Sequence, residues 1–159
     1  MSIKKYFIND KRPLNPNNAV AAIIKNSSNE FLLQLRDLMS GIFYPGHWGL
    51  FGGALEDIDN NPKDGLIREL QEELNIYINK NEILEFTNFT FDFSFAEKGI
   101  LSRTYYEIIL SDKQINSIKL GEGKDFSFFP LDKVLLQKKV VPYDQYALWL
   151  YSAKSRLKK

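Results

Sequence analysis

A short acidic segment is the part of the sequence whose residues are best suited to chemistry. Residues 68–76 read Arg-Glu-Leu-Gln-Glu-Glu-Leu-Asn-Ile, and the pair Gly52-Gly53 precedes them. On a helix, Glu69, Glu72 and Glu73 are spaced i, i+3 and i+4, so their carboxylates share one face. Like charges at this spacing repel each other, and a helix selected only for stability would carry a lysine at one of these positions. Carboxylates grouped in this way suit a hard divalent cation such as Mg²⁺ or Mn²⁺.

A solvated acidic helix face would explain the same composition. Two neighbouring features favour the metal site instead. Arg68 belongs to the same helix and can hold an adjacent carboxylate in place, and Gly52-Gly53 would let a backbone carbonyl approach a cation closely. The residues themselves therefore predict a divalent-metal site and leave its reaction open.

The elements that must position this segment alternate between strands and helices. Apolar or period-two runs predict strands at residues 19–25, 30–36, 89–95, 103–110 and 126–129. Apolar residues at three- and four-residue spacing predict helices at residues 63–74 and about 144–157. A mixed sheet with a helix on each face would bury both apolar stripes, which is an α/β arrangement. The length of 159 residues predicts one domain, 1–159, with residues 1–18 as a polar arm that packs loosely.

The glycine and the acidic helix together resemble the Nudix signature, G-x5-E-x7-R-E-U-x-E-E-x-G-U, in which U is a bulky aliphatic residue. The matching positions are Gly53, Arg68, Glu69, Leu70, Glu72, Glu73 and Ile76. The resemblance extends from about Ala19 to Tyr146. It implies an α/β/α sandwich and the Mg²⁺- or Mn²⁺-dependent hydrolysis of a phosphoanhydride bond. The expected substrate is a nucleoside diphosphate derivative, either a nucleotide sugar or a nucleoside triphosphate.

Two positions depart from the signature. The spacing from Gly53 to Arg68 is one residue longer than the signature, so its acidic loop position falls on or near Asp59. The role of this loop residue stays open. Asn75 stands where the signature has glycine, and asparagine is the next-best residue for a left-handed helix end. We therefore expect the turn to survive.

The resemblance also assigns roles within the acidic segment. It implies that Glu69, Glu72, Glu73 and the Gly53 carbonyl hold one to three Mg²⁺ or Mn²⁺ ions, with Glu73 as the central ligand. Cations there would offset the repulsion between glutamates and a diphosphate, and would lower the pKa of a water. Arg68 is expected to orient Glu69 rather than to contact the substrate.

The general base is open between two glutamates. Glu122 lies between two glycines in residues 121–123 and resembles a late-loop glutamate that reaches the metal site in several family members. The glycines suit a mobile loop, although an ordinary turn glutamate is an equal alternative. Glu56, in the loop after the glycine pair, is a second candidate for a ligand or base.

Four other residues are candidates for contact with the substrate. Arg36, at the end of a predicted strand, could reach a phosphate, but it could also be a surface arginine. Phe43 and Tyr44 could stack on a base, although loop aromatics often cover the core instead. Tyr143 lies at a helix start beside Asp144, for which an N-cap is the simpler explanation.

The composition excludes several classes of protein. The formal net charge of +1 gives no basis for a nucleic-acid binder. The absence of cysteine excludes disulfide scaffolds and thiolate metal sites, and also isomerase chemistry that needs a reactive thiol. The apolar runs are too short for a membrane span, and the N-terminus has no secretory signal pattern, so we expect a cytoplasmic protein.

A non-catalytic module that senses or binds nucleotides on the same fold is the alternative function. Such modules typically lose helix glutamates, and this chain keeps them. The expected partner is a small nucleotide substrate, and a homodimer is expected by analogy alone.

Overall fold

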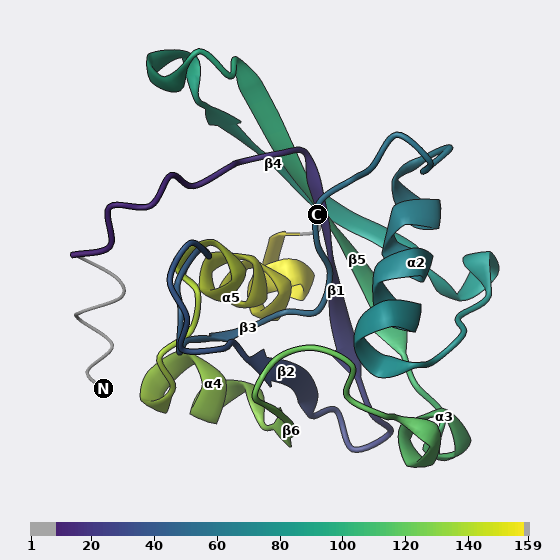
Figure 1. Ribbon diagram of the computed structural model, residues 1–159. Helices are drawn as coiled ribbons and strands as arrows, with labels where there is room; N and C mark the ends of the chain where they lie inside the picture. Colours follow the sequence, from purple (N-terminus) through teal and green to yellow (C-terminus); the bar gives the residue numbers. More distant parts are fainter. Residues whose placement is uncertain (1–8, 158–159) are drawn as a thin grey trace.

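A six-stranded sheet lies between helix α2 (Pro62–Leu74) and helix α5 (Pro142–Leu157), as Figure 1 shows. The structure is a computed structural model and describes residues 9–157. The strands are β1 (Ala19–Lys25), β2 (Phe31–Leu35), β3 (Trp48–Gly49), β4 (Leu84–Asp92), β5 (Ile100–Ile109) and β6 (Asp125–Phe129). Helices on both faces of one sheet make an α/β/α arrangement, as predicted.

The sheet is mixed because one of its central pairs is parallel. The strand order is β3-β2-β1-β5-β4, and β6 also pairs with β2. Strands β1 and β5 are parallel, with Ala19 opposite Arg103, and the other pairs are antiparallel. The chain after β3 also runs along β1, where Val20 N donates to Gly53 O at 2.9 Å. The glycine pair is therefore attached directly to the central sheet.

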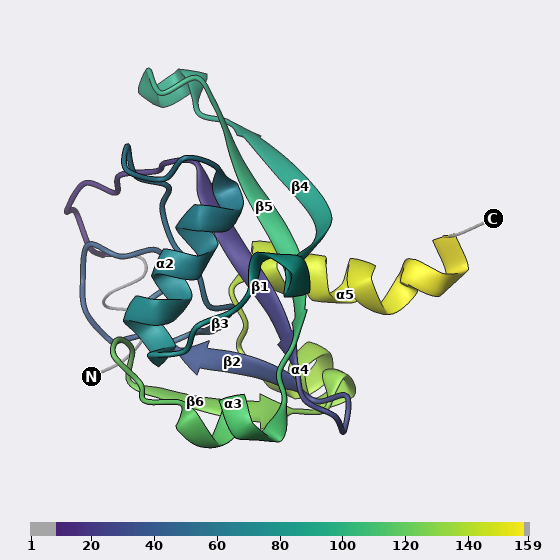
Figure 2. The same cartoon turned by 90° about the vertical axis from the view of Figure 1, so that its right-hand side faces the viewer.

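Strand β1 separates two hydrophobic clusters. Val20, Ala22 and Ile24 pack in the cluster that includes the leucines of α2, whereas Ala21 and Ile23 pack in the cluster that includes residues of α5. This alternation follows the period-two geometry of a strand. It fixes α2 on one face and α5 on the other, which Figure 2 shows from a second direction.

Both ends of α2 are capped by asparagine. The Asn61 side chain accepts a hydrogen bond from Asp64 N, and Pro62 occupies the first turn. At the other end, Asn75 has φ 53° and ψ 36°, and its N–H donates to Gln71 O. The expectation that asparagine preserves the left-handed helix end is confirmed.

Several elements differ from the sequence prediction. The strand predicted at 89–95 ends at Asp92, because Asp92 accepts a hydrogen bond from Ser94 N and the chain turns into the short helix η2 (Ser94–Ala96). Helices α3 (Asp112–Ser117) and α4 (Leu131–Gln137) and the turn η1 (Lys80–Glu82) were not predicted. They are too short to show a clear apolar period.

The start of α5 corrects the prediction for Asp144. The helix begins at Pro142, so Asp144 lies inside its first turn and is not the N-cap. Its side chain is only 2% exposed and accepts a hydrogen bond from Leu50 N at 3.0 Å. Asp144 therefore joins α5 to the chain beside β3.

The described part of the polar arm, residues 9–18, is held against the body by side-chain hydrogen bonds. Asp10 accepts one from Gly41 N at 2.7 Å, and Asn18 accepts one from Ser102 N at 2.9 Å. This part is thus more firmly attached than predicted, and residues 1–8 lie outside the described residues. Across residues 9–157, no helix has the length and apolar content needed to cross a bilayer.

Candidate active site

Glu73 is the most buried acidic residue of α2. Its side chain faces the sheet, and the residue is 6% exposed. One carboxylate oxygen accepts a hydrogen bond from Gly52 N at 2.8 Å, and the other accepts one from Gln34 Nε2 at 3.3 Å. Burial raises the pKa of Glu73 to about 8; the nearby carboxylates of Glu69 and Glu122 act in the same direction, and the two hydrogen bonds oppose them. The surroundings of this carboxylate therefore favour an added positive charge.

The glycine pair permits two close approaches at the site. Gly52 has φ +128°, and a Cβ there would lie 2.3 Å from Val20 O. A Cβ on Gly53 would lie 2.6 Å from the carboxylate atoms of Glu69. The Gly53 carbonyl, predicted as a metal ligand, already accepts the hydrogen bond from Val20 N, so its second lone pair is the one left for a cation.

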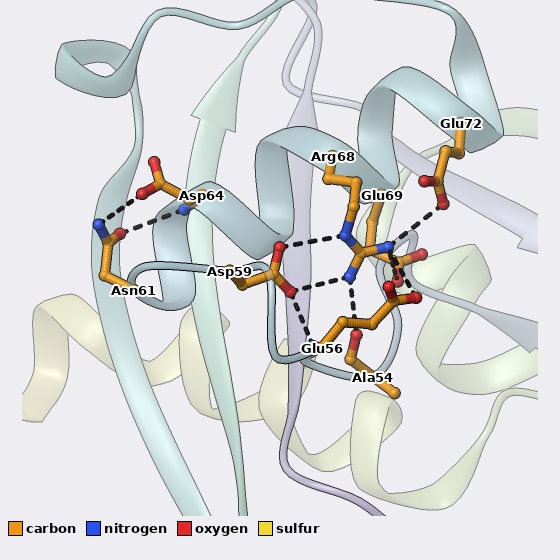
Figure 3. A network of polar contacts seen from close by, with 8 residues as sticks. All are labelled: Ala54, Glu56, Asp59, Asn61, Asp64, Arg68, Glu69 and Glu72. Atoms are coloured by element: carbon orange, nitrogen blue, oxygen red, sulfur yellow. Dashed lines mark hydrogen bonds and ion pairs between the residues drawn. The ribbon is translucent and has the colours of Figure 1, made fainter.

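Arg68 uses all three of its guanidinium nitrogens within the protein (Figure 3). Nε and Nη2 donate to the Asp59 carboxylate at 3.1 and 3.0 Å, and Nη2 also donates to Ala54 O at 3.0 Å. Nη1 donates to Glu69 at 3.0 Å and to Glu72 at 3.3 Å. The hydrogen bonds between Arg68 and Asp59 raise the pKa of the arginine and lower that of the aspartate. Despite the longer loop, Asp59 is thus the acidic partner of Arg68, and Arg68 contacts Glu69 as predicted.

The three helix glutamates do not converge on one point. Glu72 turns toward Arg68 with its side chain 52% exposed, while Gly52 and Gln34 hold Glu73 on the inner side. Within residues 9–157, no group of three or more acidic or histidine side chains is arranged as a ready metal site. The predicted convergence is therefore not observed, because Arg68 draws Glu72 away. The donor set itself, carboxylate and carbonyl oxygen, still fits Mg²⁺ or Mn²⁺.

The loop that carries Glu122 is fastened to the end of α2. Gly121 N donates to Glu73 O at 2.7 Å, and a Cβ on Gly121 would lie 2.1 Å from Glu72 O. The backbone carbonyl of Glu122 accepts a hydrogen bond from Gln34 Nε2 at 3.0 Å. These contacts hold the loop that we expected to be mobile, and they leave the exposed Glu122 side chain beside Glu69 and Glu73.

One cleft of about 810 Å³ connects these groups with the predicted substrate residues. Its lining includes Gly53, Glu69, Glu73 and Glu122, whereas Glu56 and Glu72 are not among the lining residues. Glu56 lies 3.5 Å from Arg68 Nη1 with its side chain 58% exposed. Of the two candidate bases, Glu122 is therefore the one that the structure places in the cleft.

The lining of the same cleft also includes all four predicted substrate residues, Arg36, Phe43, Tyr44 and Tyr143. Arg36 is half-buried rather than a surface arginine, and its Nε donates to Phe43 O at 2.8 Å. The rings of Tyr44 and Tyr143 meet edge to face, with centroids 5.8 Å apart. An arginine, a group of aromatic rings and the glutamates thus line the same cavity.

Sequence reasoning missed several residues of the cleft. Phe91 and Phe93 line it, although their alternation indicated only a half-buried strand. Gln34 carried a usable signal, since it is a polar residue inside the apolar strand β2. Arg103 carried none, because its partner Asp144 is distant in the sequence. Asp144 accepts hydrogen bonds from Arg103 Nε at 3.2 Å and from the Tyr105 hydroxyl at 3.0 Å.

Comparison with models of protein families shows to which family the chain is related. A family model described as NUDIX domain matches residues 15–150. The chain belongs to the Nudix family. This membership confirms the predicted family and the predicted class of enzyme, a Nudix-type pyrophosphohydrolase. Nudix hydrolases typically act on nucleoside diphosphate derivatives. A comparison with curated protein sequences gave no match.

Solved structures share the Nudix fold with this chain. The MutT protein from Methanosarcina mazei Go1 is 22% identical, with 93% of this chain and 99% of that chain covered and a TM-score of 0.70. The MutT NUDIX hydrolase from Burkholderia pseudomallei is 20% identical, with coverages of 85% and 97% and a TM-score of 0.66. The NUDIX domain of Shewanella oneidensis NrtR, complexed with ADP ribose, is 21% identical, with coverages of 99% and 100% and a TM-score of 0.62. These similarities confirm the predicted fold class.

Proposed function

We propose that this Nudix protein hydrolyses a phosphoanhydride bond in a nucleotide sugar or a nucleoside triphosphate, with Mg²⁺ or Mn²⁺. The observation that carries the proposal is the cleft itself. Its lining combines a buried glutamate and two neighbouring carboxylates with an arginine and several aromatic rings. Such a cavity suits a ligand with a charged diphosphate and a planar base.

Glu69, Glu73, Glu122 and the Gly53 carbonyl would hold one to three divalent cations, with Glu72 released from Arg68 as a further ligand. A bound cation supplies charge neutralisation for the diphosphate and a lowered pKa for an attacking water. The raised pKa of Glu73 supports this assignment, because its cause is burial together with neighbouring negative charge.

The remaining residues would position the carboxylates or bind the substrate. Arg68 fixes the direction of the Glu69 carboxylate, and Gln34 joins Glu73 to the loop of Glu122. Glu122 is the preferred general base, since it lines the cleft close to both Glu69 and Glu73. Arg36 would contact a phosphate, and Tyr143 would pack against the base or the second moiety.

A non-catalytic binding module remains the second candidate. The complex of the NrtR domain with ADP ribose supports it, and also makes ADP-ribose a useful probe for this chain. The retained Glu69, Glu72 and Glu73 favour catalysis. A cytoplasmic location, a homodimer and a partner set without nucleic acid stay predictions.

A substrate screen tests the proposal. Nucleoside triphosphates, nucleotide sugars and ADP-ribose are incubated with the protein and either Mg²⁺ or Mn²⁺, and phosphate release and product masses are measured. We expect at least one compound to be cleaved at a phosphoanhydride bond, and EDTA to abolish the reaction. Binding of a nucleotide without any turnover would favour the sensing module instead.

A further inference from the structure

The described part of the N-terminal arm, residues 9–18, is fastened to the body at both ends. Near its start, the Asp10 side chain accepts a hydrogen bond from Gly41 N at 2.7 Å. At its end, the Asn18 carbonyl accepts a hydrogen bond from Leu55 N at 2.8 Å. The stretch between these two anchors therefore has a defined position against the rest of the chain.

The two anchors join the arm to both groups of predicted site residues. Gly41 precedes Phe43 and Tyr44 in the chain, in the loop between β2 and β3. The other anchor point, Leu55, follows Gly53 by two residues. The arm thus runs from the loop with the aromatic rings to the glycine pair, and Figure 1 shows it as the purple trace that leads into β1.

Side chains between the two anchors line the same cleft as the glutamates. They are Arg12, Leu14, Asn15, Pro16 and Asn17. None of these five is acidic, so this stretch adds no carboxylate to hold a divalent cation. It offers apolar surface with a few polar groups instead, which is the combination typical of pockets for small organic molecules.

The exposure of these side chains indicates which part of a ligand they could contact. Leu14 is 47% exposed, and Met39, which also lines the cleft, is 52% exposed. A base or a sugar that covered these side chains would remove apolar surface from water, which stabilises a complex. A bare diphosphate has no apolar surface to offer in return. The amides of Asn15 and Asn17 are exposed as well and could form hydrogen bonds with such a group.

We infer that the arm is part of the substrate-binding surface, with residues 12–17 contacting the nucleoside or the second moiety of the substrate, outside the metal-bound diphosphate. The inference rests on the proposed nucleotide substrate. Asp10 is a positioning residue in this arrangement, because its bond to Gly41 N holds the stretch that contacts the ligand.

Analogues that cannot be hydrolysed between the α and β phosphorus atoms test the inference without turnover. Isothermal titration calorimetry in Mg²⁺ buffer compares methylenediphosphonate with the α,β-methylene analogues of ADP, GDP, UDP, CDP and ADP-ribose. We expect at least one nucleotide analogue to bind about tenfold more tightly than methylenediphosphonate, or better. Leu14→Ala and Asn15→Ala should each reduce this ratio of affinities about three- to tenfold, with the affinity for methylenediphosphonate unchanged.

Two comparisons separate ligand contact from a general effect on the fold. Asp10→Ala removes the acceptor for Gly41 N and should reduce the ratio about tenfold, whereas Asp10→Asn keeps an acceptor oxygen and should lose less. Asn116→Ala is the matched control for Asn15→Ala, since Asn116 is exposed on α3 and is not among the residues that line the cleft. This control should leave both affinities unchanged.

The outcomes distinguish this inference from the proposed reaction. Equal affinities for methylenediphosphonate and every nucleotide analogue would overturn the inference, as would unchanged ratios in Leu14→Ala, Asn15→Ala and Asp10→Ala. If the ratios fall in these variants but the protein hydrolyses nothing in the substrate screen, the inference is supported and only the proposed hydrolase function fails. Hydrolysis together with unchanged ratios would leave the hydrolase function standing and reject the role of the arm.

Discussion

Arg68 and Arg103 each donate to an aspartate, Asp59 and Asp144 respectively, and they use their guanidinium groups differently. Arg68 bonds through all three nitrogens to Asp59, Glu69, Glu72 and Ala54 O. Arg103 lines the cleft, donates through Nε to Asp144 at 3.2 Å, and lies close to the rings of Tyr105 and Tyr143. The residue type is the same, but only Arg103 is among the residues that line the cleft.

This difference suggests separate roles for the two arginines, one in positioning carboxylates and the other in binding a ligand. Around Arg68, protein groups already balance each other's charge, so substitutions there should change how the carboxylates are held. Arg103 and the neighbouring Tyr143 line the cleft, so substitutions there should change how a ligand binds. Variants near each arginine can therefore show whether one region holds the carboxylates and the other binds the ligand.

The largest expected effect is at Glu73. Glu73→Gln removes the charge of the buried central ligand and should lower kcat by at least about 100-fold, or about 2.7 kcal/mol in the activation barrier. The metal-free variant should melt no lower than the wild type, because a buried carboxylate is costly and the amide keeps its shape. Steady-state kinetics and calorimetric melting measure both quantities. Glu72→Gln, at an exposed position outside the cleft lining, should lose less; equal losses would contradict the separate roles of the two glutamates.

Substitutions of the two glycines should separate an effect on kcat from an effect on stability. Gly53→Ala places a Cβ against the flexible end of Glu69, so kcat should fall by about tenfold or more with little loss of stability. Gly52→Ala places a Cβ 2.3 Å from the backbone oxygen of Val20 at a positive φ, and should cost about 2–3 kcal/mol of unfolding free energy. Urea denaturation together with kinetics distinguishes the two. If Gly53→Ala lost stability but kept its kcat, Gly53 would have no part in positioning Glu69.

Gln34 offers a smaller and more selective change. Gln34→Leu keeps a side chain of similar size but replaces the polar amide by an apolar group, which removes the hydrogen bonds to Glu73 and to the Glu122 carbonyl. Metal affinity should fall by about tenfold, because groups that orient metal ligands have effects of this size. Electron paramagnetic resonance with Mn²⁺ measures the affinity without turnover. Unchanged Mn²⁺ binding would mean that Gln34 has no part in holding the ligands.

Substitution of Tyr143, which lines the cleft, should give the smallest effect. Tyr143→Leu removes the ring beside Arg103 and should raise KM about three- to tenfold with kcat little changed, because base–aromatic contacts contribute mainly to binding. Tyr143→Phe keeps the ring and serves as the control, with KM near the wild-type value. A loss in kcat alone would place Tyr143 in the chemical step instead.

The sequence predicted the elements whose patterns are local and long. The leucine spacing of α2, the alternation in β4 and the left-handed tendency of Asn75 each report on a few neighbouring residues. The Arg68–Asp59 pair was harder to predict from the sequence, because the longer loop left the acidic position uncertain. The Arg103–Asp144 pair could not be predicted from the sequence, since it joins a strand to a helix that is distant along the chain. Asp144 was misread because Pro142, and not a residue nearer to Asp144, begins the helix.

The parallel pairing of β1 with β5 has a consequence for how the protein becomes active. These strands are neighbours in the sheet, although α2 and β4 lie between them in the chain. Contacts between such distant segments form slowly during folding, since a long loop must close before they are gained. Gly53 is bonded to β1 at Val20, so the glycine pair takes its final position only with that strand in place. Refolding should therefore regain helix signal before activity, and a partly folded chain would carry its full set of glutamates without yet being an enzyme.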